Sequence, residues 1–140
     1  SGATANSYGQ SPSAMALLGC DFANLAFSLN DVAANKAPAT LVSELAALIA
    51  GYCPNGNASL TVENESSAGW NANATLAAQH AAAAAIRAMG VANGHPVIDL
   101  PARWGDYGTA VANGLIANDP HPNAAGYADK AVALMHILWN

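Results

Sequence analysis

The chain has 140 residues, a mass of 14.0 kDa and a formal net charge of −5, and this length fits a single domain with one apolar core. Hydrophobic residues make up 53% of the sequence and charged residues only 9%, which excludes intrinsic disorder. Four Lys and Arg residues against nine Asp and Glu residues leave no basic surface for a nucleic acid, and no apolar run is long enough to cross a membrane. The low charge and the abundance of Asn, Ser and Thr favour an extracellular or virion-associated protein.

Hydrophobic periodicity predicts strands that alternate with helices. Strands are expected at residues 22–27, 59–63 and 95–100, and helices at 12–18, 39–50, 73–89, within 103–116 and at 123–138. Gly51 and Gly90 follow two of these helices and end them. The alternation predicts one α/β domain over residues 1–140, a three-layer α/β/α fold whose parallel, flavodoxin-like sheet has helices on both faces.

The two cysteines permit one disulfide and cannot form a cysteine-based zinc site. Cys20 precedes the first predicted strand, and Cys53 follows the helix at 39–50. A helix that returns antiparallel across a sheet brings its end back to the start of the strand, so we expect Cα atoms about 4.4–6.8 Å apart. The alternative is a pair of buried thiols.

The segment most specific for chemistry is D-P-H-P-N-A-A-G-Y, residues 119–127, which precedes the last predicted helix. His121 lies between two prolines, and Asp119 precedes it closely. A carboxylate can hold one ring nitrogen, set the tautomer and stabilise the imidazolium, so this arrangement is typical of an oriented general base. Asn123 is suited to cap the last helix. The alternative for His121 is a loop histidine with an ordinary backbone contact.

Three segments, in chain order, resemble sequence blocks of the SGNH (GDSL) hydrolase family. H-P-N-x-x-G-Y at residues 121–127 resembles the last block, in which the catalytic histidine opens the final helix. S-L-N-D at residues 28–31 follows an apolar strand as the family's G-x-N-D block does, with Ser28 in place of glycine. S-G-A-T at residues 1–4 resembles the block whose glycine N–H binds the oxyanion. The resemblance covers essentially the whole chain and implies a serine ester hydrolase without cofactor or metal.

The resemblance also implies a role for each matching residue. His121 would be the general base, and the Asn30 side chain and the Gly2 backbone N–H would donate to the oxyanion. The family places its orienting Asp three residues before the histidine, where this chain has Asn118. We expect Asp119 to take that role, because a carboxylate stabilises an imidazolium and an amide does not. The alternative for Asn30 is a strand end that caps a turn.

The nucleophile block departs most from the family pattern. The family's G-D-S block follows the first strand, and no apolar strand precedes Gly2 in this chain. Gly9-Gln10-Ser11 is the local substitute, but too few residues separate Ser11 from Asn30 to hold the elements that the family places between them. The sequence therefore predicts that a complementary N-terminal segment or a partner chain supplies the nucleophile strand and pairs with the strand at 22–27.

We interpret the chain as the larger, C-terminal part of an SGNH-type hydrolase domain that deacylates a carbohydrate or another ester. One alternative is a non-catalytic SGNH-like binding or structural module of a phage tail or secreted protein. Another is an unrelated flavodoxin-like module, in which Asn30 and His121 would lie far apart. The other histidines, His80, His95 and His136, are interpreted as structural or surface residues.

Overall fold

The computed structural model describes residues 4–5, 21–53, 55 and 57–139 of the chain. In chain order the elements are β1 (Ala23–Leu25), α3 (Leu29–Ala33), α4 (Pro38–Tyr52), β2 (Ala58–Val62), α5 (Leu76–Asn93), β3 (Val97–Asp99), α6 (Leu100–Trp104), α7 (Tyr107–Ala112), β4 (Ile116–Asn118), β5 (His121–Pro122) and α8 (Ala124–Trp139). Every strand and helix that the sequence predicts within these residues has a counterpart, and the predicted helix at 12–18 lies outside them.

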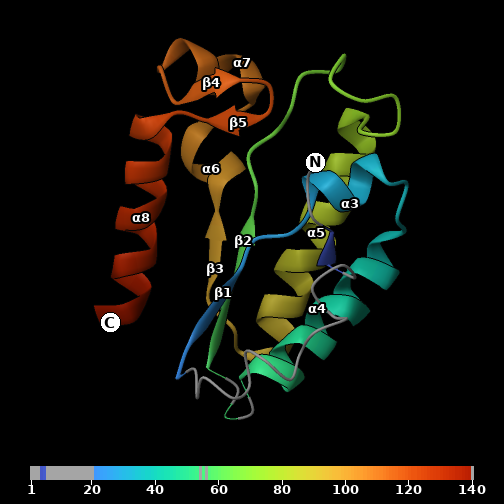
Figure 1. Ribbon diagram of the computed structural model, residues 1–140, viewed down its shortest axis with the longest axis vertical. Coiled ribbons are helices and arrows are strands. Elements are labelled where there is room, and N and C mark those ends of the chain that lie inside the picture. The colour runs from blue at the N-terminus through green and yellow to red at the C-terminus, as the bar shows by residue number, and fades with distance from the viewer. Residues whose placement is uncertain (1–3, 6–20, 54, 56, 140) are drawn as a thin grey trace.

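Three parallel strands form the sheet in the order β1-β2-β3, so β1 lies at one edge (Figure 1). Helices α4 and α5 cover one face of the sheet, and α6 and α8 lie on the other (Figure 1). The predicted α/β/α arrangement with helices on both faces is therefore confirmed. Parallel strands need crossover connections, and the helices between β1, β2 and β3 supply them.

Successive side chains of β2 point to opposite faces of the sheet. Leu60 and Val62 are buried in the larger core together with side chains of α4 and α5. The intervening Ser59 and Thr61 are also buried, and both bond to Asn24 of β1: Asn24 Nδ2 donates to Ser59 Oγ at 2.7 Å, and Thr61 Oγ1 donates to Asn24 Oδ1 at 3.1 Å. Because these polar groups satisfy one another, the sheet can bury them without large cost.

Helix α3 begins where the sequence predicts the end of a strand. The first strand is shorter than expected, and Leu29 is already helical. The reason is a carboxylate directly after β2: Glu63 Oε2 accepts hydrogen bonds from the backbone N–H of Ser28 at 2.9 Å and of Leu29 at 3.0 Å. An acidic group at a helix N-terminus satisfies free N–H groups and favours the helix.

Helix α5 is displaced by a few residues from its predicted range. It begins after Thr75, whose side-chain oxygen accepts a hydrogen bond from the N–H of Ala78 at 3.2 Å. It continues through Gly90 and ends at Gly94, where φ is 68°. Glycine adopts this left-handed backbone conformation more easily than other residues, so the helix ends at Gly94 and not at Gly90.

The sequence also predicts that the chain has no membrane span and that Cys20 and Cys53 can form a disulfide. None of the helices in the described ranges is long and apolar enough to cross a membrane. Cys53 is buried at the C-terminal end of α4, and Cys20 lies outside the described residues, so the disulfide stays a prediction.

Candidate active site

His121 is held by a short antiparallel ladder between β4 and β5. Asn118 pairs with His121 in this ladder, and its Oδ1 lies 3.1 Å from Nδ1 of the imidazole. An amide oxygen only accepts hydrogen bonds, so this contact places the ring proton on Nδ1 and leaves Nε2 free to accept a proton. His121 is exposed. The ladder thus presents an oriented imidazole to solvent.

Asp119 does not take the position that the sequence predicts. Its carboxylate accepts hydrogen bonds from the backbone N–H of Ser67, at 2.9 Å, and from the Ser67 hydroxyl. The β4–β5 pairing sets residue 118 opposite residue 121 and turns Asp119 toward the loop that follows β2. Asn64 of the same loop donates to the carbonyl oxygen of Pro120 at 2.8 Å. Asp119 therefore anchors the turn that carries the histidine, and Asn118 contacts the imidazole.

The first turn of α8 explains the spacing of the motif that follows His121. Asn123 caps this helix as predicted: its Oδ1 accepts from the N–H of Ala125 at 2.9 Å and of Gly126 at 3.0 Å. A Cβ atom on Gly126 would lie 2.3 Å from the carbonyl oxygen of Leu115. Glycine at this position therefore lets α8 approach the segment before β4 closely.

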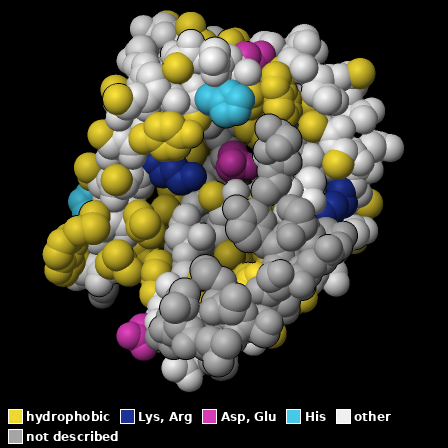
Figure 2. Space-filling view, in the orientation of Figure 1, with side chains coloured by type: hydrophobic (Ala, Val, Ile, Leu, Met, Phe, Trp, Pro, Cys, Tyr) yellow, Lys and Arg dark blue, Asp and Glu magenta, His cyan; other side chains and the backbone are white. Residues whose placement is uncertain are grey.

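Asn30 and His121 line the same cavity, as the sequence predicts. This cavity, of about 110 Å³, is called the His121 cavity below, and its lining residues are Leu29, Asn30, Glu63, Asn64, Leu100, Pro120, His121, Pro122, Tyr127 and Lys130. It lies beyond the carboxyl ends of β1, β2 and β3, where open parallel sheets bind their ligands. Figure 2 shows a histidine, a basic and an acidic side chain around a hollow on this face, and the lining contains one of each.

The residue next to Asn30 connects α3 to the N-terminal part of the chain. Asp31 is fully buried and accepts hydrogen bonds from the Ala5 N–H at 3.1 Å and from Lys36 Nζ at 2.5 Å. Gly2 and Ser11 lie outside the described residues, so their predicted roles stay predictions. No serine hydroxyl in the described part of the chain is hydrogen-bonded to His121.

Two solved structures share this architecture. The chain matches a lipase/acylhydrolase from Enterococcus faecalis with a TM-score of 0.82 and 17% identity, over 97% of this chain and 70% of that one. It matches a protein from Lactobacillus plantarum with a TM-score of 0.70 and 18% identity, over 97% of this chain and 72% of that one. The likeness shows that this chain shares the α/β fold of these two proteins. No family model and no curated protein matches the sequence.

The fold brings two charged residues into the His121 cavity that the sequence analysis did not select. Besides its two backbone bonds, Glu63 Oε2 accepts from the Ser28 hydroxyl at 3.1 Å. Lys130 projects from α8, where Tyr127 precedes it by one helical turn. Burial lowers the pKa of Lys130, and attraction to the Glu63 carboxylate partly offsets this effect. The sequence did contain a signal for Lys130: it is one of only four Lys and Arg residues, and it lies three residues after Tyr127 of the motif, on the same face of the last helix.

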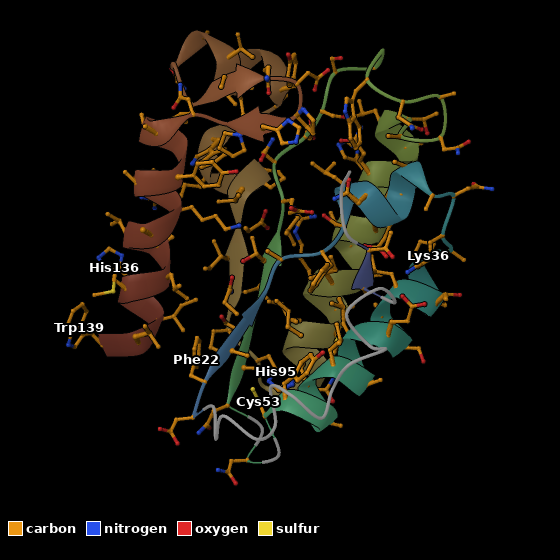
Figure 3. The ribbon with its side chains drawn as sticks, in the orientation of Figure 1. Phe22, Lys36, Cys53, His95, His136 and Trp139 are labelled. Carbon is orange, nitrogen blue, oxygen red and sulfur yellow. The ribbon has the colours of Figure 1, made fainter. Side chains whose placement is uncertain are left out.

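The remaining histidines lie away from the His121 cavity. His95 and Cys53 are at the opposite end of the sheet, and His136 and Trp139 are near the C-terminal end of α8 (Figure 3). His80 Nε2 lies 2.7 Å from Glu65 Oε1 beside a second cavity of about 300 Å³, between α3 and α5. In the described ranges, no group of three or more His, Cys, Asp or Glu side chains is arranged to hold a metal ion.

Proposed function

We propose that this chain carries most of the active site of a serine ester hydrolase, with His121 as general base and Asn30 as an oxyanion donor. The observation that carries the proposal is the His121 cavity, which joins these two side chains at the ligand-binding edge of an SGNH-type fold. The Enterococcus faecalis protein of this fold is described as a lipase/acylhydrolase. We extend the same reaction class, the cleavage of an acyl ester, to this chain.

The proposed reaction has two acyl-transfer steps. A serine oxygen attacks the ester carbonyl while Nε2 of His121 takes the serine proton, and the carbonyl oxygen becomes an oxyanion. The Asn30 amide and a backbone N–H, which the sequence resemblance assigns to Gly2, stabilise that oxyanion. The imidazolium then protonates the departing alcohol, and a water molecule, activated by the same base, releases the acid from the serine. Asn118 keeps the imidazole in the required tautomer throughout.

We further propose that the nucleophilic serine comes from a complementary segment that pairs with β1. This strand lies at the edge of the sheet. Helix α8 also leaves apolar side chains exposed, at Val132, Met135 and Leu138. About 30% of the Enterococcus faecalis chain has no counterpart in this one, since the match covers 70% of it. An added strand and helix would cover both surfaces, and unpaired strand edges otherwise favour aggregation. Ser11 is the second candidate for the nucleophile.

A non-catalytic SGNH-like binding module is the second candidate function. Two observations favour it: the side chain against His121 is the amide of Asn118 and not a carboxylate, and no described serine reaches the imidazole. Such a module would use the His121 cavity for binding alone. An acylated carbohydrate as ligand and an extracellular or virion-associated location fit either function and remain proposals.

The test compares hydrolysis of a chromogenic acetyl ester by the chain alone and by the chain with its complementary segment. We expect the chain alone to aggregate or to be inactive, and the assembly to lose its activity in the His121→Ala variant. His95→Ala is the matched control, since His95 lies at the opposite end of the sheet (Figure 3). Equal activity of wild type and His121→Ala would reject the catalytic role and favour the binding module. A soluble, active monomer would make Ser11 the nucleophile.

A further inference from the structure

The charged groups near the His121 cavity differ in whether they already have hydrogen-bond partners in the protein. Glu63 Oε2 accepts three hydrogen bonds from Ser28 and Leu29 at the start of α3. Asp119 is bonded to Ser67, outside the cavity lining. Both carboxylates therefore already accept hydrogen bonds from other residues of the protein.

Lys130 is the exception. It lines the cavity, and no described residue forms a hydrogen bond or an ion pair with its ammonium group; the Glu63 carboxylate acts on it only through longer-range attraction. The neighbouring acid on α8, Asp129, is directed to α6, where it accepts from Arg103 Nε at 2.5 Å and from Trp104 Nε1 at 2.7 Å. Desolvating an ammonium group without a partner is costly, so a half-buried lysine of this kind is suited to a ligand that brings the partner.

We propose that Lys130 binds an anionic group of the substrate, so that the site prefers esters that carry one negative charge to neutral esters of equal length. The proposal rests on the proposed function, because it names the substrate class of the same cavity. Lys130 and His121 line one small cavity, so a carboxylate bound by the ammonium would lie near the ester that reacts at the imidazole.

The charge of the cavity selects the kind of anion. The described lining contains one lysine and one glutamate, so its formal charge is zero before binding, and a singly charged carboxylate beside Lys130 would add one negative charge. A doubly charged phosphate ester would be repelled by Glu63 about twice as strongly and would find no second cation among the described lining residues. The inferred substrates are therefore esters of carboxylate-bearing molecules, in either the acid or the alcohol part.

The test measures binding and does not require turnover. Monomethyl succinate is the charged probe, dimethyl succinate is the neutral probe, and the NMR signals of the His121 ring report occupancy. We expect the charged probe to bind at least about fivefold more tightly than the neutral one, as for a favourable partly desolvated ion pair. Lys130→Met should remove this difference, and Lys130→Arg should keep it. Arg87→Gln is the control, since it removes a positive charge from a residue outside the cavity lining that does not contact the acid next to Lys130.

Each outcome decides the proposal. Equal binding of both probes by the wild type would overturn it, as would an unchanged preference in Lys130→Met. If Lys130 acted instead on the oxyanion, Lys130→Met would reduce kcat for charged and neutral esters alike and leave the binding ratio intact, which also contradicts the proposal. A preference for the charged probe in an assembly of the chain with its complementary segment that hydrolyses no ester would support anion binding by Lys130 and reject the proposed hydrolase function.

Discussion

Nδ1 of His121 lies 3.1 Å from Oδ1 of Asn118, so an amide occupies the position at which an acid would strengthen the base. The amide oxygen fixes the imidazole tautomer but carries no full charge to stabilise the imidazolium that the proposed mechanism would form.

Asn118→Asp should raise kcat for ester hydrolysis by the active assembly, by about tenfold or more, because a carboxylate stabilises the imidazolium in the transition state. The comparison is Asp119→Asn, which should lower the melting temperature by weakening the contact with Ser67 but should leave kcat within a few-fold of the wild type. Steady-state kinetics and thermal denaturation of both variants give the answer. If Asp119→Asn abolished turnover while Asn118→Asp had no effect, Asp119 would be the orienting acid after all.

Asn30→Ala should reduce kcat by about 10²- to 10³-fold and leave KM nearly unchanged. The oxyanion exists mainly in the transition state, so a missing donor affects the chemical step and not substrate binding. Initial-rate measurements over a range of ester concentrations separate the two constants. A large rise in KM with unchanged kcat would show that Asn30 binds the ground state of the substrate.

Gly126→Ala should destabilise the protein by about 1–3 kcal/mol, because the new methyl group would overlap the carbonyl of Leu115 and push α8 away from it. Gly69→Ala is the matched control, since a Cβ at that position meets no atom within 4 Å. Urea denaturation of the two variants measures the difference. Equal stability of both variants would mean that α8 shifts without cost.

Asp129→Asn should lower the stability at neutral pH and lose its effect in acid. Hydrogen bonds from Arg103 and Trp104 hold the pKa of Asp129 at about 2, below its ordinary value of 3.8. A lowered carboxyl pKa stabilises the folded state above the ordinary value, and this contribution is lost as the pH falls from about 4 to about 2. Urea midpoints should therefore differ between wild type and variant at pH 6 and converge near pH 2. A constant difference at all pH values would assign the effect to packing.

The sequence by itself determined the elements whose signals are local. Periodic apolar residues define α4, α5 and α8, and the predicted cap Asn123 lies within one turn of the N–H groups that it binds. The motif around His121 and the S-L-N-D segment were sufficient to predict the fold that this chain shares with a lipase/acylhydrolase and to place Asn30 and His121 in one cavity. These inferences depend on neighbours in the chain, or on the rule that parallel strands end at a common edge.

The tertiary structure decided which polar groups meet. Asp119 bonds to Ser67, 52 residues away, and the start of α3 depends on Glu63, 35 residues beyond Ser28. Lys130 enters the His121 cavity because Gly126 allows α8 to pack closely against the segment before β4. Hydrogen bonds between distant residues depend on how the layers pack, and packing is a property of the whole fold that no local pattern of residues encodes.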